Sequence, residues 1–122
     1  MDEIFIPGNV PSSKNSKQWT GKMLINSKAT RKYISDTKLY YIKNKLKFRR
    51  MLRDKKKPYK IYFRFIRGTK HKFDYINPAQ TVQDLMVKYG WIHDDNCNEI
   101  IPIFDKYKYD KNNCGVYIWV GK

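Results

Sequence analysis

Residues 59–67 read YKIYFRFIR, in which the odd-numbered positions from 59 to 65 are apolar or aromatic. The positions between them carry Lys60, Tyr62 and Arg64. Because successive side chains of a strand point to opposite faces, this period of two predicts a strand that buries one face. We expect the odd-numbered side chains to point into the core and the other three to point away from it.

A long helix is predicted upstream, from Ser27 to about Met51. Large side chains recur there at helical spacing, while the remaining positions are rich in lysine and arginine. Such a pattern is typical of a helix with one face in the core and a basic face outside. The expected buried set is Tyr33 or Ile34, Thr37, Tyr41 and Phe48, joined by Leu39, Ile42 and Leu46.

A second helix is predicted downstream, from about Pro78 to Tyr89. Asn77 is a suitable N-cap, proline is favoured at the first helical position, and Gly90 is suited to the position just after the helix. Ala79, Val82, Leu85, Met86 and Tyr89 are expected in the core, and Asn77, Gln80, Asp84 and Lys88 are expected to share a polar face. Trp91, among apolar residues, indicates core or interface.

Three further strands are predicted, at Glu3–Ile6, Glu99–Phe104 and Val116–Val120, and Pro102 indicates an edge position or a bulge. Residues 9–22 are polar and punctuated by glycine and proline, which indicates a loop. The element order is therefore β-α-β-α-β-β, an α+β fold. A chain of 122 residues fits one domain, residues 1–122, because two would each be too small to bury a useful core.

Composition excludes several classes of protein. The chain has 26 Lys+Arg against 11 Asp+Glu, a net charge of +15, with 41% hydrophobic residues. That apolar content is too high for a disordered basic tail, and no apolar run is long enough to cross a membrane. The start MDEIFIPG does not resemble a secretory signal, and two cysteines are too few for a disulfide framework. We expect a cytoplasmic protein with an acidic partner.

Charge is distributed unevenly along the chain. Residues 1–73 carry 21 bases and 4 acids, whereas residues 74–99 carry five acids and one base. Basic proteins bind phosphate groups through counterion release, and an acidic segment would repel the same ligand. A bound divalent cation removes that conflict, because carboxylates hold Mg²⁺ or Mn²⁺ and the metal then faces the phosphate. If the next strand lies beside the first, Asp74 and the pair Asp94-Asp95 can meet at one edge of the sheet.

The stretch Asp74–Asp95, DYINPAQTVQDLMVKYGWIHDD, resembles the signature of RusA-type Holliday junction resolvases. The family pattern is roughly D-x-D-N-x-x-K, a helix with an internal Asp, then G-x-x-x-D-D. Residues 11–15, PSSKN, are similar to the family's Pro-Ser-x-Asn opening. The resemblance implies a small Mg²⁺-dependent homodimer that cuts four-way DNA junctions, with a two-fold axis matching the junction. Because the family is common on prophages, it also implies a bacterial or phage source.

Carried over by position, the resemblance implies catalytic roles for Asp74 and Asp95, with Asn77, Asp84, Gly90 and Asp94 on family positions. Two positions depart: Ile76 stands for the family's second catalytic Asp, and Gln80 for its catalytic Lys. In one interpretation the chain is an active variant, with metal ligands Asp74, Asp95, Asp94, Asp84 and Asn77. Asp94 would be a ligand or the general base, and Gln80 would hydrogen-bond a metal-bound water or a phosphate oxygen.

DNA contacts are expected from the basic N-terminal loop, the first helix and the segment after residue 67. The predicted DNA-binding residues are Lys14, Asn15, Lys17, Trp19, Arg31, Lys32, Lys70 and Lys72. No membrane or small-molecule cofactor is expected as a partner. Two alternatives remain open, a junction-binding dimer that has lost catalysis and a basic RNA-binding protein.

Overall fold

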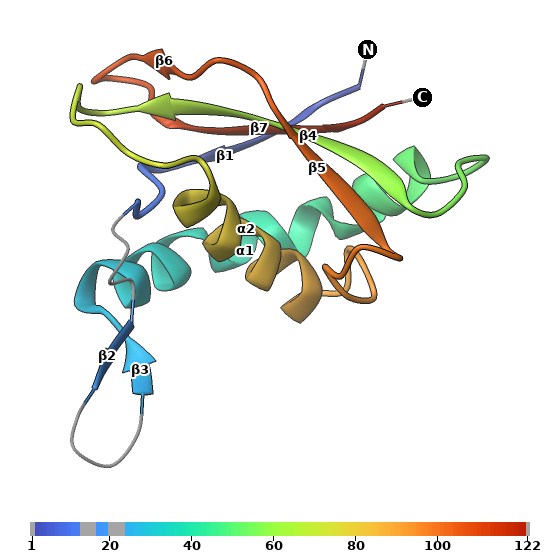
Figure 1. Cartoon of the computed structure of the whole chain (residues 1–122), viewed down its shortest axis with the longest axis horizontal. Helices are drawn as coiled ribbons and strands as arrows, with labels where there is room; N and C mark the ends of the chain where they lie inside the picture. The colour runs from blue at the N-terminus through green and yellow to red at the C-terminus, as the bar shows by residue number, and fades with distance from the viewer. Residues whose placement is uncertain (1, 13–16, 20–23, 122) are drawn as a thin grey trace.

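The chain folds as a five-stranded mixed sheet with two helices packed on one of its faces (Figure 1). The structure, a computed structural model, describes residues 2–12, 17–19 and 24–121, with the backbone alone at 17–19 and 24–26. These form a single mixed α/β domain. Its elements are β1 (Ile4–Pro7), β2 (Lys17–Trp19), β3 (Leu24–Asn26), α1 (Lys28–Met51), β4 (Tyr59–Arg67), α2 (Ile76–Lys88), β5 (Ile100–Phe104), β6 (Lys108–Tyr109) and β7 (Gly115–Val120).

Strand β4 lies in the middle of the sheet, whose order is β1-β7-β4-β5, with β6 also paired to β4. It runs antiparallel to β7 and parallel to β5, so that Tyr62 lies between Trp119 and Ile103. The predicted alternation is confirmed: Ile61, Phe63 and Phe65 are fully buried. The strand at residues 59–67 therefore supplies the centre of the core.

Helix α2 connects the parallel strands β4 and β5 and covers the sheet. It begins at Ile76, two residues earlier than predicted, so Asn77 lies inside the first turn and is not the N-cap. The predicted C-terminal stop is confirmed. Gly90 has φ +79°, and the amides of Gly90 and Trp91 donate to the carbonyls of Val87 and Met86. This is the Schellman arrangement, which glycine favours because it has no Cβ.

Helix α1 begins after Ser27, whose hydroxyl accepts a hydrogen bond from the Thr30 amide. Tyr33, Thr37, Tyr41 and Phe48 are buried, as predicted. The prediction was wrong for three apolar residues, because Leu39, Ile42 and Leu46 are exposed. At about 100° per residue they lie about 100–160° around the helix from Tyr41, outside the stripe that faces the sheet.

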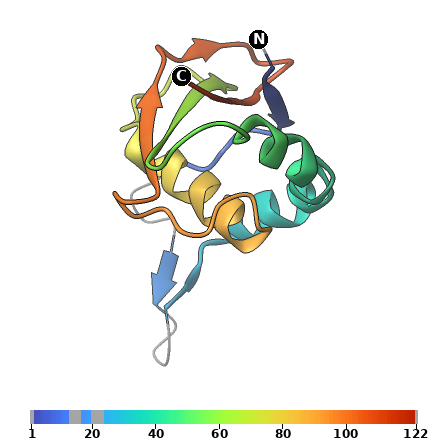
Figure 2. The ribbon, with the colours of Figure 1, turned by 90° about the vertical axis from the view of Figure 1, so that its right-hand side faces the viewer.

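Two short pairings were missed by the sequence interpretation. Strands β2 and β3 form a hairpin inside and just after the expected loop, and this hairpin projects from the domain at the start of α1 (Figures 1 and 2). Strand β6 is a two-residue pairing within the expected loop before β7. β2 and β3 have three residues each and β6 has two, which is too short for an alternating pattern to predict a strand.

Among the described residues, no helix covers the second face of the sheet, called here the outer face (Figures 1 and 2). Its side chains come from alternate positions of β1, β7, β4 and β5. Tyr62 stacks on Trp119 at 5.4 Å between centroids, and the Arg64 guanidinium lies 5.0 Å from the Trp119 ring. Ile101, on β5, is an exposed aliphatic residue of this face. β5 lies at the edge of the sheet, which is one of the two positions that Pro102 predicted.

In the described part of the chain, no helix combines the length and the apolar character that a membrane crossing requires.

Candidate functional site

The polar face predicted for α2 exists, and one of its residues joins two carboxylates. Gln80 Nε2 donates to Asp84 Oδ1 at 2.8 Å and lies 3.4 Å from Asp95 Oδ2. Asn77 precedes Gln80 by one helical turn on the same face. We call Asn77, Gln80, Asp84 and Asp95 the acid–amide ridge. Lys88, predicted on this face, lies near the Tyr89 ring instead.

The ridge explains how two like-charged groups lie near one another. An amide N–H donor between carboxylate oxygens occupies the position that a cation would take, and it reduces their mutual repulsion. The same amide, turned by 180°, presents its carbonyl oxygen, which is a suitable ligand for Mg²⁺. The donor set of Asp84, Asp95 and Gln80 therefore fits a hard divalent cation in its chemistry.

The predicted reason for carboxylate convergence was wrong. Strands β4 and β5 are neighbours, but they are parallel and pair Tyr59 with Ile100. The end of β4, which leads to Asp74, and the start of β5, which follows Asp95, therefore lie at opposite ends of the sheet. The Asp95 side chain nevertheless extends to the second turn of α2, where its Oδ2 lies 3.4 Å from Gln80 Nε2.

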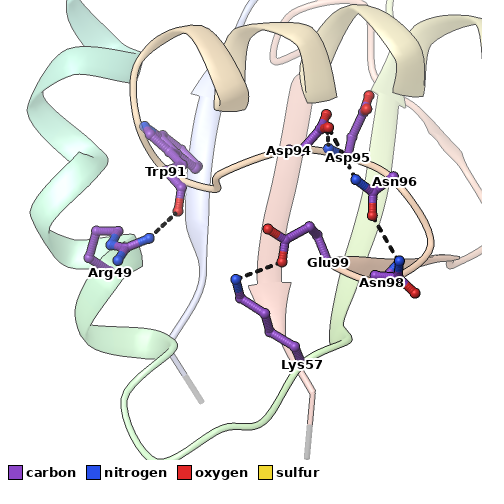
Figure 3. A network of polar contacts seen from close by, with 8 residues as sticks. All are labelled: Arg49, Lys57, Trp91, Asp94, Asp95, Asn96, Asn98 and Glu99. Atoms are coloured by element: carbon purple, nitrogen blue, oxygen red, sulfur yellow. Dashed lines mark hydrogen bonds and ion pairs between the residues drawn. The ribbon is translucent and has the colours of Figure 1, made fainter.

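Asp94 has a different environment from Asp95. Its Oδ1 accepts the Asp95 amide at 2.8 Å and its Oδ2 accepts Asn96 Nδ2 at 3.1 Å, while the Asp95 side chain points away from Asn96 (Figure 3). These hydrogen bonds lower the pKa of the Asp94 carboxyl, with the contact to the Asp95 amide contributing most. A carboxylate with a lowered pKa is a weaker general base. These contacts favour a role in shaping the loop.

Two residues that the sequence interpretation did not consider hold this loop. Asn96 Oδ1 accepts the Asn98 amide at 2.9 Å, and Glu99, nearly buried, forms a 2.7 Å ion pair with Lys57 (Figure 3). Asparagine before a strand indicates a turn, but nothing in the sequence points to an ion pair across 42 positions.

Asp74 lies in a pocket of about 630 Å³ beside the N-terminus of α2. We call it the Asp74 pocket, and its lining is Ser12, Lys70, His71, Lys72, Phe73, Asp74, Tyr75, Asn77 and Tyr107. Asn77 belongs to both the pocket and the ridge, so the two are continuous along the first turns of α2. Three cationic or titratable side chains and three aromatic rings surround one carboxylate.

Arg67 lies behind this pocket and is 5% exposed. Its guanidinium donates to the Val10 carbonyl and to Ser12 Oγ, and it lies 4.8 Å from the Phe73 ring. Burial lowers the pKa of Arg67 from its usual value, although the group stays protonated. Arg67 therefore fixes Ser12 and Phe73, two parts of the pocket wall that are 61 positions apart.

The five predicted metal ligands are not gathered into one cluster. Within residues 2–12, 17–19 and 24–121, no group of three or more His, Cys, Asp or Glu side chains is placed to hold a metal ion. Asp84 and Asp95 meet at Gln80, Asp74 and Asn77 line the pocket, and Asp94 contacts Asn96. The fit to a cation thus rests on two carboxylates and one amide, whereas Asp74 precedes the first residue of α2, Ile76.

The predicted DNA-binding residues fall into three groups. Lys70 and Lys72 line the Asp74 pocket and are exposed. Arg31 and Lys32 are exposed on the first turns of α1, where Lys32 forms a 2.7 Å ion pair with Asp36. Lys14 and Asn15 lie outside the described residues, and the side chains of Lys17 and Trp19, on β2, also lie outside them.

Ser12, Phe73 and Tyr75 were missed as site residues. Ser12 lies in the PSSKN motif, and Phe73 and Tyr75 flank Asp74, so their nearness in sequence to those motifs was the signal that could have found them. The Tyr107 side chain could, from the sequence, stack on a base or pack between subunits, and nothing in the sequence separates the two. The structure places Tyr107 in this pocket, where its amide donates to the Tyr75 hydroxyl at 3.0 Å.

Neither the scan against protein-family models nor the search of curated proteins finds a match to this chain.

Proposed function

We propose that this chain is a metal-dependent endonuclease that hydrolyses phosphodiester bonds in four-way DNA junctions, acting as a homodimer in recombination and repair. The observation that carries the proposal is the continuity of the acid–amide ridge with a lysine-lined pocket in a chain of net charge +15. A protein that only adheres to phosphates gains nothing from carboxylates along the phosphate path, since they weaken binding. The resemblance of residues 74–95 to RusA-type resolvases supports the same activity.

Each group of the ridge has a proposed role. Asp95 and Asp84 would hold the cation together with the Gln80 carbonyl oxygen, and Asp74 would contribute its charge from the adjoining pocket. Bound there, Mg²⁺ or Mn²⁺ supplies positive charge at the scissile phosphate and lowers the pKa of an attacking water. Lys70 and Lys72 hold the neighbouring phosphates, and Asp94 keeps the loop in the shape that directs Asp95 toward α2.

The departure from the family pattern at Ile76 provides a test in which activity is gained. Ile76 is 69% exposed at the first position of α2, so Asp fits there without disturbing the core and is favoured near a helix N-terminus. The variant Ile76→Asp, which keeps Gln80 as a proposed ligand, is expected to cleave synthetic junctions with Mg²⁺ about tenfold faster than the parent, or more. The measurement is single-turnover cleavage on labelled junctions, with EDTA as the metal-free control.

Three outcomes distinguish the alternatives. Cleavage by the parent supports the proposed active variant. Cleavage by the Ile76→Asp variant alone identifies a junction-binding protein whose catalysis has decayed. If neither protein cuts with Mg²⁺ or Mn²⁺, the nuclease proposal fails. Tighter binding to folded RNA than to junctions would then favour the RNA-binding alternative.

The outer face of the sheet is the proposed surface for the second copy. The exposed apolar stripe on α1 lies among lysines, so pairing two such helices would bring like charges together. On the outer face, Arg64 lies 3.3 Å from Asp105, which directly follows β5, and the exposed Lys60 pairs with Ile101. The stacked rings of Tyr62 and Trp119 and the aliphatic Ile101 supply the apolar part of this face. A two-fold pairing through this face would match the symmetry of a four-way junction.

Introducing a charge on the outer face is expected to dissociate the dimer. Ile101→Glu places a carboxylate at a residue that is 42% exposed, and burying it against a second copy would carry a desolvation cost. We expect self-association at least about tenfold weaker in sedimentation equilibrium. The matched control is Leu39→Glu on α1, at a residue 74% exposed, which should leave the dimer intact. The reverse result would assign the interface to α1, and a parent that stays monomeric would contradict the homodimer.

The proposed setting is the cytoplasm of a bacterium, with the gene carried by the host or by a phage. It follows from the family resemblance and from the nature of the substrate.

A further inference from the structure

We infer that the Asp74 pocket receives a nucleobase, unstacked from the DNA strand, next to the phosphate that the acid–amide ridge acts on. The inference rests on the proposed nuclease for the identity of the strand. The pocket volume, about 630 Å³, is within the range of about 300–1,000 Å³ that is typical of small-molecule sites. The ridge requires a backbone phosphate only, so this pocket is an additional site.

Three aromatic rings line the pocket, which is the feature that points to a flat ligand. Phe73 lies 5.3 Å from the Tyr75 ring and 5.2 Å from the Tyr107 ring, edge to face in both cases. The three rings pack against one another and all border the pocket, so together they give it an aromatic wall. Stacking of a base on an aromatic side chain contributes about 1–3 kcal/mol and is tolerant of sequence.

The rings are held before a ligand arrives. Tyr75 stacks on Phe104 with centroids 5.5 Å apart, its hydroxyl accepts the Tyr107 amide, and Arg67 lies over Phe73. A base would therefore enter a site whose walls need little ordering, which lowers the entropy cost of binding.

The charges around the pocket fit a nucleotide better than a neutral ring. Lys70, His71 and Lys72 come from consecutive positions along the rim, and Lys70 Nζ is 5.0 Å from the Tyr109 ring. The negative charge of Asp74 would repel a phosphate placed next to it. We therefore expect the phosphate of the nucleotide to lie beside Lys70 and Lys72. Ser12 and Asn77 offer hydrogen-bond donors and acceptors to the edge of a base.

The test measures binding of mononucleotides to the full chain without divalent metal, so that it is independent of cleavage. The probes are the four 2′-deoxynucleoside 5′-monophosphates and, lacking a base, 2-deoxyribose 5-phosphate. We expect at least one nucleotide to bind about tenfold more tightly than the sugar phosphate. Its titration should shift the aromatic NMR signals of Phe73 and Tyr107.

Variants separate stacking from simple charge attraction. Tyr107→Leu should remove the advantage of the nucleotide, Tyr107→Phe should keep it, and Phe73→Leu provides a second ring deletion. Tyr40→Leu is the matched control, because Tyr40 is an exposed tyrosine of α1 beside Lys43. Equal affinity for nucleotides and sugar phosphate, or full nucleotide affinity in both ring deletions, would overturn the inference and leave the nuclease proposal standing. Loss of cleavage activity with intact nucleotide binding would contradict the nuclease proposal and leave the inferred nucleobase site standing.

Discussion

Replacing Asp74 or Asp95 with asparagine is expected to slow metal-dependent cleavage of four-way junctions by about 100-fold or more. Asparagine has nearly the same size as aspartate, but it lacks the negative charge that would hold a divalent cation in the proposed site beside Gln80 and the pocket. Junction binding in EDTA should be unchanged or tighter, because each variant removes a charge that repels phosphate. Single-turnover cleavage and a gel-shift titration on the same junction measure the two effects.

The control is Asp110→Asn, which removes the same charge at a turn remote from the ridge. Asp110 Oδ1 accepts the Asn112 amide at 3.0 Å, and asparagine keeps that acceptor, so the fold should be unaffected. Cleavage by the control is expected to equal that of the parent. If the Asp74 and Asp95 variants also cut like the parent, the carboxylates have no part in the reaction and the proposed site is wrong.

Truncating Trp91 is expected to cause the largest loss of stability. Its ring is fully buried between α1 and the loop after α2, 5.0 Å from the Phe48 ring and 5.5 Å from the Tyr41 ring. Trp91 Nε1 also donates to the Tyr41 carbonyl at 2.7 Å. We expect Trp91→Ala to lower the free energy of unfolding by about 3–5 kcal/mol, measured by urea denaturation.

Trp91→Phe separates packing from hydrogen bonding. Phenylalanine keeps an aromatic ring but cannot donate to the Tyr41 carbonyl. We expect this loss to lower the free energy of unfolding by about 1–3 kcal/mol. Leu39→Ala, at an exposed position of α1, should change stability by no more than about 0.5 kcal/mol. A loss below about 1 kcal/mol for Trp91→Ala would show that the loop carrying Asp94 and Asp95 is not anchored by this residue.

The acid–amide ridge was partly predictable. The spacing of Asn77, Gln80 and Asp84 placed them on one helical face, and the hydrogen bond from Gln80 to Asp84 confirms this. The contact between Gln80 and Asp95 was not predictable, because it depends on where the loop after α2 runs.

Local pattern determined the elements that bury a face or carry a cap. The alternation of residues 59–67, the Ser27 cap and the Gly90 stop each depend on interactions within a few residues, so the sequence alone indicates them. Leu39 was misassigned because hydrophobicity shows that a residue can be buried, whereas the width of the buried stripe depends on what packs against the helix.

Tertiary structure alone decided where the candidate site groups meet. The parallel pairing of β4 with β5 separated Asp74 from the start of β5, and the Asp74 pocket joined Ser12 and Tyr107 to residues 70–77. Contacts of this kind link positions tens of residues apart. They depend on strand order and loop path, which arise when the whole chain packs and leave no periodic trace in the sequence.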